Sequence, residues 1–187
     1  METQPVLQPL VTLFVAFLGP WFAYRLSRKE QAKRDALNRQ IEKTRLTLSM
    51  LASYDDPEFS NRRRTLAEFQ RDWDQDKEKI VDIIFPPNHQ TVAAFFAHKP
   101  DSEQALIQHQ NVNRFLAYIS ILVAYHDRDL IDPELLRIFA PRYSAYRPFL
   151  NNLKIAVYQR CDSGNIRLPH WCRALAEIEK ILKLPRL

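Results

Sequence analysis

The chain has 187 residues, of which 2 are glycine and 12 are proline, and its 27 basic and 22 acidic residues give a net charge of +5. Average glycine usage of ~7% would give roughly 13 glycines in a chain of this length, so the low count disfavours hairpin-rich β-folds and the glycine-rich phosphate loops of nucleotide enzymes. Two cysteines are too few for a disulfide scaffold, and we expect both to remain thiols.

The segment from residue 6 to residue 24 contains no charged side chain. An α-helix needs about 20 largely apolar residues to cross a bilayer, and this segment just reaches that length. Trp and Tyr favour the headgroup zone, and both occur at its end. We therefore expect residues 1–26 to form an N-terminal membrane anchor, with anchoring side chains Leu10, Leu13, Phe14, Phe17, Trp21 and Tyr24.

Basic residues follow the apolar segment at once, and no Lys or Arg precedes it. This juxtamembrane basic cluster consists of Arg25, Arg28, Lys29, Lys33 and Arg34. The positive-inside rule then places the N-terminus outside the bacterial inner membrane and residues 27–187 in the cytoplasm, with membrane lipid as a partner of the anchor.

Three other interpretations of the apolar segment stay open. A cleaved signal peptide needs a positive n-region and a small-residue cleavage site, and this segment has neither. An interfacial helix needs a polar face, whereas residues 10–24 are apolar on all sides apart from Thr12. A helix buried in a protein core is the third alternative.

The remainder of the chain shows helical hydrophobic spacing, so the predicted fold class is all-α: one transmembrane helix continuing into a cytosolic bundle of about five helices. A heptad-like seam with alternating spacings of four and three is formed by Leu37, Ile41, Thr44, Leu48 and Leu51. The sequence YDDP at 54–57 predicts a break, because a residue before proline avoids the helical region. The next apolar stripe is expected to pair antiparallel with the seam.

Further helices are expected from about 60 to 85, from 102 to about 129 and from 169 to 184. The apolar run 115–125 is too short to cross a bilayer, so it predicts the buried centre of the bundle. Asp132 followed by Pro133 predicts a capped restart of helix.

Residues 113–160 carry a pattern of apolar, aromatic and basic residues. Asn113 and Phe115 open the apolar helix, and the segment DLIDPELL at 129–136 marks a break and a restart. Further along the chain come Arg142, Tyr143, Tyr146, Phe149 and Arg160. The pattern resembles a family of small bacterial proteins known only as a domain of unknown function. The resemblance implies an N-terminal membrane helix joined to a cytosolic helical domain, and no activity. Family members often carry an acidic residue where this chain has Leu116.

Two sets of residues suggest metal chemistry, each with a simpler explanation. His126 and Asp127 form an H-D pair like that of metal phosphohydrolases, but a histidine at a helix C-terminus also suits the helix dipole. Cys161, His170 and Cys172 could supply three zinc ligands, although structural zinc sites normally have four with close cysteine pairs. We assign no catalytic residue, metal or cofactor.

Two basic segments suggest contacts with partners. The run 62–64 is all arginine, but acidic residues follow it closely, so nucleic-acid binding is not favoured. A possible contact site with a protein or peptide combines Arg142, Tyr143, Tyr146 and Arg147.

The function expected from these features is a single-span membrane protein whose bundle serves as an interaction or regulatory module, bound to a protein partner or to further copies of itself. The alternatives are a small oligomeric membrane effector, a helical enzyme whose site is not visible in the sequence, and a basic nucleic-acid-binding domain. No small-molecule substrate is indicated.

Overall fold

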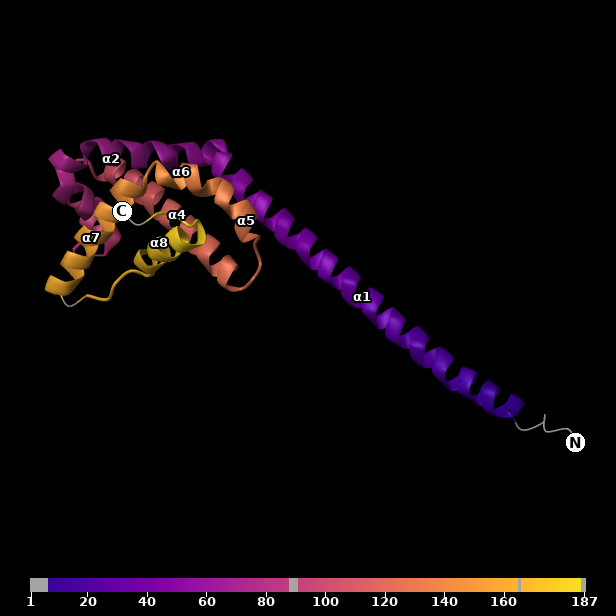
Figure 1. The fold of residues 1–187 in the computed structure, drawn as a ribbon. Coiled ribbons are helices and arrows are strands. Elements are labelled where there is room, and N and C mark those ends of the chain that lie inside the picture. Colours follow the sequence, from indigo (N-terminus) through magenta and orange to yellow (C-terminus); the bar gives the residue numbers. More distant parts are fainter. Residues whose placement is uncertain (1–6, 88–90, 165, 186–187) are drawn as a thin grey trace, which may run out of the picture. The chain divides into compact units, whose positions relative to one another are not determined.

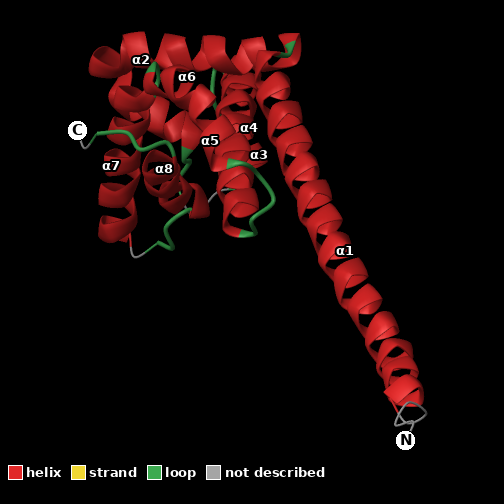
Figure 2. Cartoon of the chain, turned by 45° about the vertical axis from the view of Figure 1, so that its right-hand side comes forward, coloured by secondary structure: helices red, strands yellow, loops and turns green. Residues whose placement is uncertain are grey.

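The computed structural model describes residues 7–87, 91–164 and 166–185, with side chains from residue 18 onward. The described residues contain helices and loops and no strand, which confirms the all-α class (Figure 2). The chain divides into two compact units, Met1–Glu42 and Lys43–Leu187. Both expected domains, 1–26 and 27–187, share one helix, because α1 (Leu7–Asp55) runs without interruption past residue 26.

The described part of the first unit is helical. Pro20 lies inside α1, and the helix continues on both sides of it. Nothing lies within 4 Å of the position that a side chain on Gly19 would take, so this glycine serves no close backbone contact. The following residues are mostly Leu, Arg, Lys, Glu, Gln and Ala, which are strong helix formers.

The second unit begins with the last turns of α1 and continues into α2 (Pro57–Ile84) (Figure 1). The predicted break at YDDP is confirmed, because α1 ends at Asp55 and Pro57 occupies the first turn of α2. The side chain of Asp56 caps α2 by accepting a hydrogen bond from the backbone N–H of Glu58 at 3.1 Å. Inside α2, Asp76 has non-helical angles (φ −120°, ψ 24°), at the point where its apolar stripe is interrupted.

Seven more helical elements complete the described part of the unit. The long helices are α4 (Ser102–Asp127), α7 (Arg147–Gly164) and α8 (His170–Ile181). The short ones are α3 (Val92–Ala97), α5 (Pro133–Leu136) and α6 (Ala140–Ser144), with the 3₁₀ turn η1 (Arg137–Phe139) between the last two. As predicted, Asp132 caps α5, with its carboxylate accepting from the N–H groups of Glu134 and Leu135 at 2.9 and 3.3 Å.

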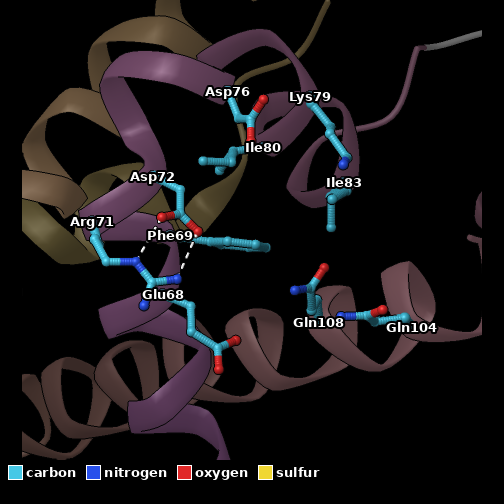
Figure 3. Close-up of a pocket in the computed structure, with 10 residues that line it drawn as sticks. All are labelled: Glu68, Phe69, Arg71, Asp72, Asp76, Lys79, Ile80, Ile83, Gln104 and Gln108. Atoms are coloured by element: carbon cyan, nitrogen blue, oxygen red, sulfur yellow. Dashed lines mark hydrogen bonds and ion pairs between the residues drawn. The ribbon is translucent and has the colours of Figure 1, made fainter.

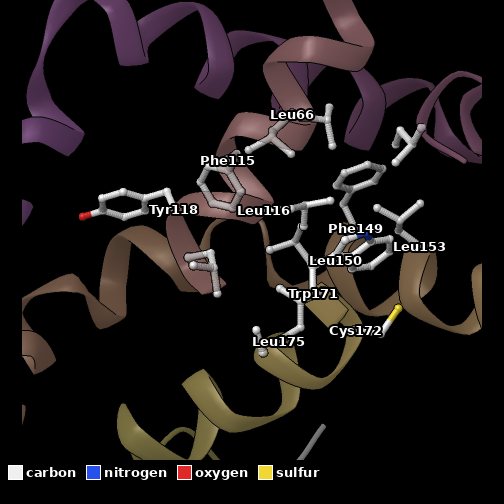
Figure 4. Packing of buried hydrophobic residues seen from close by; sticks show 14 of the residues in the cluster. Leu66, Phe115, Leu116, Tyr118, Phe149, Leu150, Leu153, Trp171, Cys172 and Leu175 are labelled. Atoms are coloured by element: carbon white, nitrogen blue, oxygen red, sulfur yellow. The ribbon is translucent and has the colours of Figure 1, made fainter. Parts of the chain in front are cut away.

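The core of the second unit forms where α2, α4, α7 and α8 meet. Figure 4 shows the side chains of Leu66, Phe115, Leu150 and Leu175, one from each of these helices, pointing into the same space. All four are at most 1% exposed. The run 115–125 supplies much of this core, which confirms α4 as the central helix.

The expected antiparallel pairing between the heptad-like seam and α2 is wrong. The main packing partners of α2 are α4 and α7, and α1 reaches α2 only near the turn, where Tyr54 contacts Phe59. Leu51 is buried in the bundle, but Leu37, Ile41 and Leu48 are at least half exposed. A heptad spacing identifies an apolar face but does not identify the helix that covers it. In this chain α2 packs against α4, which is more apolar than α1.

Candidate functional site

The expected membrane anchor lies in the first unit, on the helical backbone of α1. The side chains of Leu10, Leu13, Phe14 and Phe17 lie outside the described part of the structure. Trp21 and Tyr24 are described, and they are 46% and 57% exposed. Among the helices whose side chains are described, none is both long and apolar enough to cross a membrane. The spanning helix therefore stays a prediction.

Exposed aromatic and apolar side chains continue to the end of the apolar segment. Phe22 and Leu26 are 61% and 65% exposed. The guanidinium carbon of Arg25 lies 4.5 Å from the centre of the Trp21 ring, and that of Arg28 lies 5.0 Å from the Tyr24 ring. The two rings thus keep their adjacent cations close, an arrangement suited to a surface that is apolar on one side and anionic on the other.

The juxtamembrane basic cluster is exposed throughout. Within the described residues, none of its five side chains forms an ion pair with a carboxylate; they are Arg25, Arg28, Lys29, Lys33 and Arg34. These cations are therefore available to an anionic partner.

The second expected site, four residues of α6, the turn after it and the start of α7, does not form one exposed surface. Tyr143 is fully buried, and burial raises the pKa of its hydroxyl above the usual range. Arg147 is 6% exposed, and its guanidinium donates to Glu179 Oε2 at 2.9 Å and to the carbonyl of Pro185 at 2.5 Å. The expectation of a contact role is wrong for these two residues, because they pair with groups inside the second unit.

The other two members lie nearer the surface. Tyr146 is half-buried, with its ring centre 6.1 Å from that of Phe115. Arg142 is partly exposed and pairs with Asp55 at 2.8 Å. A second cation, Arg63 from α2, reaches the same carboxylate at 3.9 Å. Both guanidinium groups also lie near the ring of Tyr54, at 5.7 and 5.2 Å.

This cluster places three arginines around the turn between α1 and α2, and two of them, Arg63 and Arg142, approach the carboxylate of Asp55. We call Arg62, Arg63 and Arg142 the arginine corner. Arg62 completes it, with its guanidinium 4.5 Å from the ring of Phe59. In the sequence Arg142 lies far from Arg62 and Arg63, so only the fold brings the three together. Burial raises the pKa of Tyr54 to about 12, so its hydroxyl stays neutral between these cations.

A polar groove of about 310 Å³ lies beside the kink of α2 (Figure 3). Its charged lining comes from α2 and its amides, Gln104 and Gln108, come from α4. In Figure 3 the guanidinium of Arg71 turns to the carboxylate of Asp72, with hydrogen bonds of 2.7 and 3.1 Å. The lining mixes both signs of charge and contains no histidine, cysteine or serine.

Both cysteines are buried, whereas His98 and His170 are exposed. Burial raises the pKa of Cys172 to about 12 and also raises the pKa of Cys161, so both thiols stay protonated. His126 Nδ1 lies 3.5 Å from Asp127. The described residues contain no group of three or more His, Cys, Asp or Glu side chains that could hold a metal ion, and His89 lies outside them.

His109 is the one buried histidine among the described residues. Its Nδ1 lies 2.7 Å from the carbonyl of Ile83, and its Nε2 lies 2.7 Å from the amide nitrogen of Asn113. A carbonyl beside one nitrogen and an amide donor beside the other fit a neutral ring protonated on Nδ1. Burial lowers the pKa of this histidine in the same direction. The ring therefore ties α4 to the end of α2.

Comparison with known proteins adds no name to these features. No family model, no curated protein and no solved structure matches the chain. The resemblance carried by residues 113–160 accordingly stays a prediction. The structure places Phe115 and Phe149 of that pattern in the core, and Arg160 in an ion pair with Asp82 at 2.8 Å. These residues thus stabilise the second unit.

Proposed function

We propose that the chain is a single-span membrane protein of the bacterial inner membrane, with an N-terminal anchor and a cytoplasmic helical bundle that serves as an interaction or regulatory module. The proposal rests on the order in which an apolar surface, aromatic rings and cations follow one another along the first unit. An uncharged apolar segment ends in exposed aromatic rings, and a cluster of cations without ion pairs among the described residues follows.

Both surfaces gain from a membrane. Trp and Tyr rings are stabilised in the headgroup zone, where their apolar bodies leave water and their polar edges keep hydrogen bonds. A Lys or Arg near an anionic leaflet contributes about 1 kcal/mol, and the effect fades within a Debye length of about 8 Å. Arg25, Arg28 and Lys29 lie within five residues of Tyr24, which is about 8 Å along a helix, so these three cations fall within that range.

The second unit supplies the interaction surface. The arginine corner holds three guanidinium groups near aromatic rings, and the described carboxylate beside them, Asp55, is half exposed. Arginine beside aromatic rings is typical of contact sites between proteins. We therefore propose that the bundle binds an acidic protein segment and holds it at the membrane.

Membrane partition tests the anchor. We expect the full chain to stay in the pellet after an alkaline carbonate wash. The double variant Leu13→Lys/Phe17→Lys places two charges in the apolar segment and should release the chain into the supernatant. The matched control Leu37→Lys/Ile41→Lys adds the same charges to α1 outside the segment and should stay in the pellet. Release of the unchanged chain, or retention of the first double variant, would refute the anchor.

A labelling experiment on the same membranes tests the orientation. We expect a membrane-impermeant maleimide to label Thr3→Cys in intact cells and to leave the exposed Ser53→Cys unlabelled until the cells are opened. The buried Cys161 and Cys172 give the background, which the unchanged chain measures. The reverse pattern would place the bundle outside the cytoplasm.

A further inference from the structure

The heptad-like seam of α1 presents an apolar stripe that is not packed in the described structure. In the first unit Leu37 and Ile41 are 61% and 54% exposed. In the second unit Leu48 is 50% exposed, although Thr47 and Leu51 beside it are buried. Single exposed apolar residues need no explanation, but three in one heptad register of one helix form a face that a partner can cover.

The seam continues toward the N-terminus with two charged residues. Counting back by sevens, Arg34 shares its heptad position with Ile41 and Leu48, and Glu30 shares its position with Leu37 and Thr44. Both charged residues are exposed. They stand four residues apart on one helix, yet no ion pair joins them in the described structure.

A second helix of the same sequence would complement this pair. In a parallel two-stranded coiled coil, a side chain at the position of Arg34 packs beside the residue four places earlier on the facing helix. That residue is Glu30 of the other copy. Two copies in register therefore form two reciprocal Glu–Arg contacts, directly next to the apolar layers of Leu37, Ile41 and Leu48. An antiparallel arrangement that pairs these apolar layers would move Arg34 away from Glu30 of the other copy.

We propose that the partner of this stripe is a second copy of the same chain, joined in a parallel, in-register coiled coil over residues 30–48. The seam ends there because Leu51 is buried in its own bundle. The parallel direction rests on the proposed membrane anchor, since two anchors in one bilayer align their helices. Confining both chains to one membrane also raises the effective concentration of the second helix, so a short seam is sufficient for the two copies to associate.

Cysteine crosslinking in membranes that contain the full chain tests the seam. Leu37→Cys and Ile41→Cys place a thiol in the interface, whereas Ala32→Cys and Arg39→Cys place one on the opposite face of the same helix. With a short bismaleimide we expect the seam variants to give about tenfold more dimer than the outward variants, since only seam positions face the other copy. Equal yields at all four positions would show random collision, and no dimer at any position would show that the copies do not meet. Either result would overturn the proposal.

Charge exchange tests the register. In the Ile41→Cys background, Glu30→Arg should place four cations together and lower the dimer yield, and Arg34→Glu should do the same with anions. The double exchange Glu30→Arg/Arg34→Glu restores both contacts and should restore the yield. A double variant as weak as the single variants would refute the parallel register. A crosslinked band of a different protein would mean that another partner covers the stripe.

Carbonate extraction of the same samples separates the two proposals. A chain that stays in the membrane but gives no seam dimer contradicts the coiled coil and leaves the anchor standing. A chain that washes off yet gives the seam dimer contradicts the anchor and leaves the coiled coil standing.

Discussion

Arg147 illustrates how a buried charge is held in this fold. Its side chain is 8% exposed, and its partner carboxylate on Glu179 is 18% exposed. The hydroxyl of Tyr143 lies 3.4 Å from the other carboxylate oxygen. Burying an ion is costly in free energy unless its partners are well placed. The sequence could not distinguish this arginine from the partly exposed Arg142, because the partner of Arg147 lies 32 residues farther along the chain.

We expect Arg147→Met to lower the free energy of unfolding by about 3 kcal/mol, because it leaves the Glu179 carboxylate half-enclosed without its cation. The double variant Arg147→Met/Glu179→Leu should recover most of the loss. Thermal unfolding of the full chain in mild detergent, followed by circular dichroism, measures both.

Arg142→Met is the matched control for this experiment. It breaks a partly exposed ion pair and should cost less than about 1 kcal/mol. If Arg147→Met cost no more than this control, the buried pair would not stabilise the second unit.

At the scale of the helices, the sequence predicts breaks and caps correctly but does not predict which helices pack together. The break at YDDP, the Asp132 cap and the central position of α4 each depend on neighbouring residues, so the sequence indicates them correctly. The partner of the seam depends on which apolar surfaces compete, and α2 packs with α4 and α7 instead. The arginine corner was missed for the same reason, since Arg142 joins α2 only through the folded second unit.

One hydrogen bond fixes the restart of helix at α5. The backbone N–H of Asp132 donates to the hydroxyl of Thr47 at 2.8 Å, and this hydroxyl donates to the carbonyl of Lys43 at 2.7 Å. Thr47 is 1% exposed. The loop before α5 is therefore attached to α1 at a point that water cannot reach, where an unpaired N–H is unfavourable.

We expect Thr47→Val, which keeps the shape and removes the hydroxyl, to lower the free energy of unfolding by about 2 kcal/mol. Thr47→Ser keeps the hydroxyl and loses one methyl group, at about 1 kcal/mol. Hydrogen exchange of the Asp132 amide distinguishes the two effects: it should accelerate in the valine variant and stay slow in the serine variant. Equal exchange in both would mean that the hydroxyl does not hold this amide.

At the scale of the whole chain, α1 belongs to two units, and its described side chains are mostly exposed in the first unit and partly buried in the second. From residue 19 to Glu42 all of its residues are exposed. From Lys43 on, the same helix contributes Thr47, Leu51 and Tyr54 to a core. Tyr54 is 2% exposed, with its ring centre 4.9 Å from those of Phe59 and Phe139. The folding boundary is therefore expected inside α1.

Two truncations test where that boundary lies. We expect residues 43–187 to unfold in a single cooperative transition at nearly the melting temperature of the full chain, because every buried contact of the second unit is kept. Residues 56–187 lose the last turns of α1, including Tyr54, and leave the hydroxyl of Tyr118 without the Met50 carbonyl that accepts from it at 2.8 Å.

The loss in the shorter chain should reach at least about 3 kcal/mol, the cost of removing one buried aromatic side chain from a core. Calorimetry of both truncations and of the full chain in the same detergent measures the difference. Non-cooperative melting of residues 43–187 would show that the second unit needs the first. Equal stability of the two truncations would instead show that the last turns of α1 contribute little, and the folding boundary would move to the YDDP break.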